Sequence, residues 1–169
     1  MSAFISIKII QISVIAFIFC NWFLSAAFCA ESITITEVQQ FRFATLAKPG
    51  SGSQTLTVPR DGSAPTGTGA ILYGTSSRGQ YNIKRTGSGS STTCTIDIQN
   101  ISSGNANLTI GSFLGNYNGS NINSFPASGL ARPSNGTGTT LYLGATATYN
   151  SSIPKGTYTP SFDIAVTLQ

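Results

Sequence analysis

The sequence contains no histidine, and charged residues make up only 8% of its 169 residues. Without an imidazole the chain cannot form a Ser-His-Asp triad, a Cys-His nucleophile or most transition-metal sites. A glycosidase needs two carboxylates facing one bond, and the few carboxylates here stand at a probable terminus, in an Asp-Gly turn or on polar strand faces. We therefore expect no catalytic residue, no metal ligand and no cofactor, and we predict that the protein is not an enzyme.

Basic residues are also few, and they are scattered. Lys84 and Arg85 are the only adjacent pair in the region that follows the first thirty residues. No stripe of cations is present that could follow a phosphate backbone. The sequence pI of about 9.2 therefore does not indicate nucleic-acid binding.

The N-terminus carries a single basic residue, Lys8, followed by a long apolar run. This pattern predicts a secretory signal peptide over residues 1–29, followed by one mature domain over residues 30–169. Ala27 and Cys29 supply the small residues that signal peptidase requires, and a cut after Ala27 is the other option. An uncleaved anchor helix is the alternative, since the run is long enough to span a bilayer. We expect a secreted, periplasmic or cell-surface protein that meets the membrane only during export.

Three cysteines leave little room for disulfides. Cys20 lies within the predicted signal peptide and Cys29 at its edge. If Cys29 survives processing, it can pair with Cys94 in an oxidising compartment. Otherwise Cys94 is expected to be a small buried residue.

The mature chain alternates apolar and polar residues with period two and is rich in Ile, Val, Thr, Tyr and Phe. This pattern predicts an all-β, Ig-like antiparallel sandwich of about eight short strands. The expected strands lie at 32–38, 40–46, 54–58, 68–73, 79–85, 92–99, 106–113, 139–148 and 157–168. Residues 115–138 are expected to form a long surface loop with a short strand.

The C-terminal segment GTYTPSFDIAVTLQ ends on a strong strand pattern. Its apolar face consists of Phe162, Ile164, Val166 and Leu168. From the pattern alone, this strand either closes the sandwich, with Gly156 as a turn residue, or pairs with a partner strand. In both cases we expect its apolar face to be buried.

Two aromatic residues, Tyr117 and Phe125, fall in the expected 115–138 loop. Sugars stack on exposed aromatic rings, so these residues are the candidates for contact with a glycan.

Three stretches, ITITEVQQFRFATL, TLYLGATATY and GTYTPSFDIAVTLQ, together resemble a bacterial secreted family of unknown function. That family is similar in layout to spore coat U-type and chaperone–usher pilin domains. The resemblance implies a pilin-like fold whose last strand a periplasmic chaperone holds by β-augmentation. Gly156, fourteenth from the end, matches the family's pattern for that strand, and Leu168 stands at its penultimate position, where the family prefers an aromatic residue. Ile33 and Ile35 are then expected in an edge strand that pairs in trans.

We therefore expect a non-enzymatic, secreted structural protein: a pilin-like or fimbrial cell-surface subunit that assembles through strand pairing. Its expected partners are further copies of itself or a periplasmic chaperone or usher. The alternative is a monomeric carbohydrate-binding or adhesive module that uses the 115–138 loop. The solution state of the mature domain would separate these two functions, because a subunit that lacks a strand should be unstable or polymeric alone, whereas a binding module should be a stable monomer.

Overall fold

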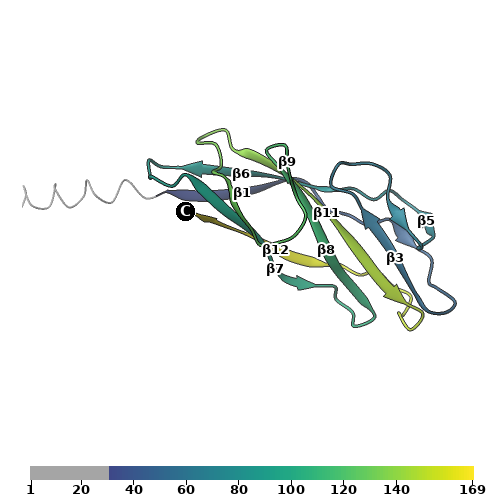
Figure 1. Cartoon of the computed structure of the whole chain (residues 1–169). Coiled ribbons are helices and arrows are strands. Elements are labelled where there is room, and N and C mark those ends of the chain that lie inside the picture. The colour runs from purple at the N-terminus through teal and green to yellow at the C-terminus, as the bar shows by residue number, and fades with distance from the viewer. Residues whose placement is uncertain (1–30) are drawn as a thin grey trace, which may run out of the picture. The chain divides into compact units, whose positions relative to one another are not determined.

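The computed structural model describes residues 31–169, and this part of the chain is built entirely of strands, turns and loops (Figure 1). The predicted signal peptide, its cleavage site and Cys29 lie outside the described residues. No helix that could cross a membrane is found between residues 31 and 169. The fold is an all-β antiparallel sandwich, as the sequence predicted.

Twelve strands, rather than about eight, form in this part of the chain. They are β1 (Ser32–Gln39), β2 (Thr45–Leu46), β3 (Ser53–Val58), β4 (Thr66–Gly67), β5 (Ile71–Tyr73), β6 (Gly79–Thr86), β7 (Thr93–Ser102), β8 (Leu108–Tyr117), β9 (Ser120–Ile122), β10 (Ala127–Ala131), β11 (Thr139–Asn150) and β12 (Ser161–Leu168).

The larger sheet is organised around the long strand β11. One edge of β11 pairs with β6 over residues 139–143 and then with β3 over residues 145–150, while its other edge pairs with β8. Gly144 stands where the partner changes from β6 to β3. A Cβ atom on Gly144 would collide with the Val58 carbonyl oxygen, so the close approach of β3 requires glycine there. β1 extends this sheet beyond β6, β4 beyond β3, and β9 pairs with β8.

The second sheet has the order β10-β7-β12 and is antiparallel throughout. The C-terminal strand pairs with β7 so that Ile164 lies opposite Ile98 and Val166 opposite Ile96. Strands β2 and β5 form a separate two-stranded sheet. The last strand of the chain is therefore held on one edge by a central strand.

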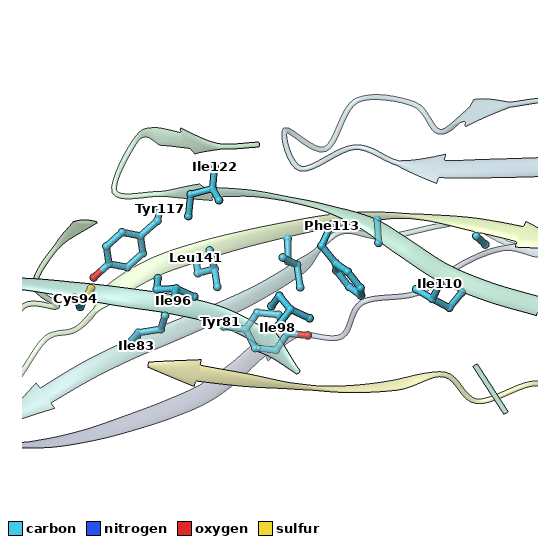
Figure 2. Close-up of a cluster of buried hydrophobic side chains, with 13 residues drawn as sticks. Tyr81, Ile83, Cys94, Ile96, Ile98, Ile110, Phe113, Tyr117, Ile122 and Leu141 are labelled. Atoms are coloured by element: carbon cyan, nitrogen blue, oxygen red, sulfur yellow. The ribbon is translucent and has the colours of Figure 1, made fainter. Parts of the chain in front are cut away.

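The core lies between the inner faces of the two main sheets (Figure 2). Its members alternate along the strands because successive side chains of a strand point to opposite faces. The fully or nearly fully buried members are Tyr81, Ile83, Cys94, Ile96, Ile98, Ile110, Phe113, Tyr117, Ile122, Leu141, Leu143, Ala145 and Ala147. Cys94 has a free thiol, and its burial raises the pKa of that thiol.

The chain divides into two compact units, each defined by the contacts between its own residues. The larger comprises residues 33–85 and 91–169 and contains the core cluster. The described residues of the smaller unit are 31–32 and 86–90. Within it, the hydroxyl oxygens of Ser32 and Thr86 lie 2.7 Å apart.

Three expected strands are shorter than predicted, and the last of them, 157–168, begins only at Ser161. The segment 40–46 keeps only β2 and a single bridge between Arg42 and Ser77, because the Ala44 amide donates to the Ser76 hydroxyl at 2.9 Å instead of to a strand. The segment 68–73 is divided into β4 and β5. The Gly69 amide donates to the Thr55 carbonyl at 2.8 Å, and beyond it the chain leaves β3 and pairs with β2.

The prediction of a long surface loop over residues 115–138 is wrong, because three strand segments occupy parts of it. β8 continues through Tyr117, turns at Asn118 and Gly119, and returns as β9, with Tyr117 opposite Ser120. Both turn residues have positive φ, 51° and 80°, as a two-residue Asn-Gly hairpin requires. β10 then pairs with β7. Three strand segments of this stretch, at 115–117, 120–122 and 127–131, therefore belong to the sheets.

Candidate strand-acceptor groove

The first and last strands of the sandwich each have an open edge. Within residues 31–169, β1 pairs only with β6, and β12 pairs only with β7. β1 belongs to the larger sheet and β12 to the smaller one, so the two open edges belong to different layers. An open strand edge presents unpaired backbone N–H and C=O groups, which favour pairing with another strand.

A groove with a volume of about 470 Å³ lies between these two strands. We call it the β1–β12 groove. One side comes from β1 and the segment that follows it, the other from the start of β12, and β6 supplies Tyr81. Its lining residues are Ile35, Glu37, Gln40, Phe41, Tyr81, Pro160, Ser161, Phe162, Asp163 and Ile164.

The apolar side chains along the groove and its two strands are only partly buried. Those of β12 are Phe162, Ile164, Val166 and Leu168; each packs against the core cluster yet keeps some exposure to solvent. Ile33 and Ile35 of β1 behave in the same way. Ile96 of β7 and Ile83 of β6 are by contrast completely buried. The core is thus only partly covered along the two open strands.

Aromatic rings fill the inner part of the groove. The ring of Phe162 lies 5.2 Å from that of Phe113, 6.2 Å from Phe41 and 6.4 Å from Tyr81, measured between centroids. All three pairs have edge-to-face geometry, which aromatic side chains favour. Burial, together with the nearby charge of Glu37, raises the pKa of Tyr81 to about 12. Tyr81 therefore stays neutral at physiological pH.

The polar groups near the groove do not form a catalytic or metal-binding arrangement. Asp163 accepts a hydrogen bond from the Asn100 amide at 2.7 Å, and Asp97 accepts from the Ile98 backbone N–H at 2.8 Å. Across residues 31–169, no three Cys, Asp or Glu side chains gather as metal ligands would. The groove is lined by apolar and aromatic side chains together with a few polar ones.

Three of the seven residues that the sequence assigned to strand pairing line the groove: Ile35, Phe162 and Ile164. Ile33 and Ile35 lie on the edge strand β1, and the four apolar residues of the last strand lie on β12. The expected burial of that last apolar face is confirmed only in part, because an edge strand without a neighbour leaves its side chains half-exposed. Whether these residues pair with a partner stays a prediction.

Gly156 does not share this position. It is exposed and precedes β12, and the groove begins only at Pro160. A Cβ atom on Gly156 would find its nearest neighbour at 3.9 Å, the hydroxyl of Tyr158. The geometry places Gly156 in the connection before the strand, outside any pairing edge, and does not require glycine there.

The two candidate ligand-contacting aromatics prove to be core residues. Tyr117 is only 1% exposed, and its hydroxyl points toward Cys94 (Figure 2). Phe125 is half-buried, packs against the core cluster, and lies so close to Gly115 that a Cβ there would be 2.9 Å from the ring. Tyr117 follows the inward alternation of β8, whereas Phe125 lies in the bend between β9 and β10. Tyr117 has almost no exposed surface while Phe125 keeps some, and contact of either residue with a ligand stays a prediction.

Seven of the ten groove residues were not among the predicted site residues, and Glu37, Phe41 and Tyr81 are three of them. Glu37 continues the alternation of Ile33 and Ile35, and this period-two spacing was the signal that could have placed it in the groove. Tyr81 joins the groove because β6 is the neighbour of β1, a pairing between distant segments that no local pattern reveals.

The comparisons with known proteins agree with the extent of this domain. No curated protein and no solved structure matched the chain. One family model, described as "Domain of unknown function (DUF4402)", matches residues 33–167, which runs from the first strand to the last. The chain therefore belongs to the DUF4402 family.

Proposed function

We propose that this protein is a secreted, non-enzymatic structural subunit of the cell surface, pilin-like in its assembly, which accepts a partner strand in the β1–β12 groove. The groove itself is the observation that carries this proposal: two open strand edges flank a floor of half-buried apolar side chains.

An added strand would satisfy both features of the groove. Its backbone would pair with the open edge of β1 or β12, and its inward side chains would cover Phe162, Ile164 and Ile35. Full burial of one large apolar side chain is worth roughly 1.5–3 kcal/mol, so completing several half-buried ones favours association. Main-chain pairing would supply affinity, and the spacing of apolar side chains would supply specificity.

The proposal is tested by the solution state of the exported protein. Light scattering and native mass spectrometry, with and without the proteins that co-purify from the same compartment, should reveal an assembled form. Amide exchange should then be slower in β1 and β12 in that form than in the monomer. A stable monomer that never acquires protection in either strand would contradict strand pairing.

A second candidate function, glycan binding, has one supporting observation. A shallow pocket of about 290 Å³ on the larger sheet is lined only by amide, hydroxyl, glycine and tyrosine groups: Asn116, Asn118, Gly119, Ser134, Gly138, Thr139, Thr140 and Tyr142. The Arg78 guanidinium carbon lies 3.7 Å from the centre of the Tyr142 ring, which holds the ring in place. Chemical-shift changes at Asn116 and Tyr142 on addition of neutral oligosaccharides would support this function, and their absence would remove it.

A further inference from the structure

Glu37 occupies an apolar position of the edge strand. Ile33 and Ile35 are half-buried against the core, while Thr34 and Thr36 between them are exposed. Period-two alternation assigns Glu37 to the same face as the two isoleucines. The lining of the groove agrees, since it includes Ile35 and Glu37 but neither threonine. Glu37 itself is exposed, so the groove-facing series on β1 ends with a solvated carboxylate at the rim of the groove.

The carboxylate of Glu37 acts on the aromatic part of the groove. Its negative charge adds to burial in raising the pKa of the Tyr81 hydroxyl. Tyr81 is 8% exposed and in edge-to-face contact with Phe162. Glu37 thus stands where the polar rim of the groove meets its apolar floor.

The charges that line the groove are of one sign. Glu37 and Asp163 are its only ionisable acidic or basic lining residues, and no lysine or arginine of the described chain lines it. The Asp163 carboxylate already accepts a hydrogen bond from the side-chain amide of Asn100, a residue of the neighbouring strand β7. A strand that covered Glu37 with an apolar side chain would remove water from a carboxylate and give it no partner, which is costly.

Resting on the proposed strand-pairing function, we propose that Glu37 selects the partner strand. The strand that fits is an extended segment of another protein, with large apolar residues at alternate positions and a lysine or arginine at the position that faces Glu37. The basic residue would form a charge-assisted hydrogen bond with the carboxylate. Strands without a basic residue would leave the Glu37 carboxylate buried and unpaired, and this cost would disfavour their binding. Inward-pointing charges on edge strands discourage pairing in the same way.

A second copy of this chain is a poorer source for such a strand. Two segments of the described chain have alternating apolar residues followed by arginine at the next alternate position: Leu56 and Val58 before Arg60, and Tyr81 and Ile83 before Arg85. Both apolar series are buried in the chain's own core. Their release would unfold the subunit that offered them.

The test uses the protein recovered after export and a set of blocked peptides with alternating Ile and Thr. In each peptide one Ile is replaced in turn by Lys, Glu or norleucine, and binding is measured by calorimetry. At one position the Lys peptide should bind at least about tenfold more tightly than the Glu peptide. Glu37→Gln should abolish this preference and Glu37→Lys should reverse it. Asp61→Asn, which removes an exposed acid outside the groove, should leave the preference unchanged.

The outcomes separate the two proposals. If no peptide binds, strand pairing itself fails. If peptides bind but Lys, Glu and norleucine are equivalent at every position, or Glu37→Gln retains the preference, the role of Glu37 is overturned while strand pairing stands. If the protein forms oligomers without peptide, and Glu37→Lys dissolves them, the partner is a second copy and the assignment to another protein is overturned.

Discussion

The ring of Phe162, in the last strand, lies 5.2 Å from the ring of Phe113 in β8, with their planes inclined by 63°. β8 belongs to the larger sheet and β12 to the smaller one, so this pair joins the two layers. Phe162 also contacts Phe41 and Tyr81. The C-terminal strand thus holds the sandwich together at the place where its apolar side chains form one wall of the groove.

Replacing Phe162 by alanine should destabilise the domain measurably. The substitution removes three ring contacts but no hydrogen bond. Because Phe162 is only half-buried, the loss should fall below the roughly 3–5 kcal/mol of a fully buried Phe→Ala change. Urea unfolding would measure it. Thr167→Ala, on the exposed face of the same strand, is the matched control and should change stability by less than about 0.5 kcal/mol.

The Asn118-Gly119 hairpin should be sensitive at its glycine. Gly119 has a φ of 80°, a conformation that side chains with a Cβ rarely adopt, so Gly119→Ala should cost about 1 kcal/mol. Gly111, within β8, has no atom within 4 Å of its Cβ position and no positive φ, so Gly111→Ala should be neutral or slightly stabilising. Thermal denaturation of both variants checks the difference. Equal losses of thermal stability in Gly119→Ala and Gly111→Ala would argue against the Asn118-Gly119 hairpin.

Alkaline pH should destabilise the protein through two tyrosines. Burial raises the pKa values of both Tyr81 and Tyr117 to about 12, whereas an unfolded tyrosine ionises near its ordinary value of 10. The folded protein therefore holds the two hydroxyl protons more tightly than the unfolded chain does. Their contribution to the free energy of unfolding is fully present below pH 10 and is lost as the pH rises from about 10 to 12. Stability curves against pH measure this decline.

Tyr117→Phe should weaken that alkaline dependence. The Tyr117 hydroxyl is buried and has no well-formed hydrogen bond with any described residue, so its removal should cost little stability at neutral pH. The variant should therefore match the wild type at pH 7 and exceed it above pH 10. A large loss at pH 7 would show that the hydroxyl has a partner.

Export should remove the N-terminal segment. Lys8, the apolar run and the small residues Ala27 and Cys29 predict a mature chain that begins at or near Ala30. Intact-mass measurement of protein from the periplasm or medium would identify the first residue. A full-length species in the membrane fraction would favour the anchor helix.

The fold class could be predicted because period-two alternation is a local signal. The strands at 32–38, 54–58, 79–85, 92–99, 106–113 and 139–148 are all confirmed, several of them longer than expected. The error at 115–138 arose because a Ser- and Asn-rich composition was given more weight than the Asn-Gly turn signal at 118–119.

The candidate site was only half accessible to sequence analysis. The apolar residues of β12 could be identified, since they alternate without interruption. Their relation to Glu37, Phe41 and Tyr81 depends on which strands are neighbours in each sheet, and this is decided by contacts between residues far apart in the chain. The misplacement of Tyr117 follows from the same cause, because its burial depends on its place on the inward face of β8 rather than on its residue type.

The most direct test of the account is amide hydrogen exchange of the exported protein with and without a bound strand peptide that carries lysine opposite Glu37. If the β1–β12 groove accepts a strand, exchange should slow in β1 and β12, where open edges become paired, and should stay unchanged in β4 and β5. Peptide binding without added protection in either β1 or β12 would contradict the central claim.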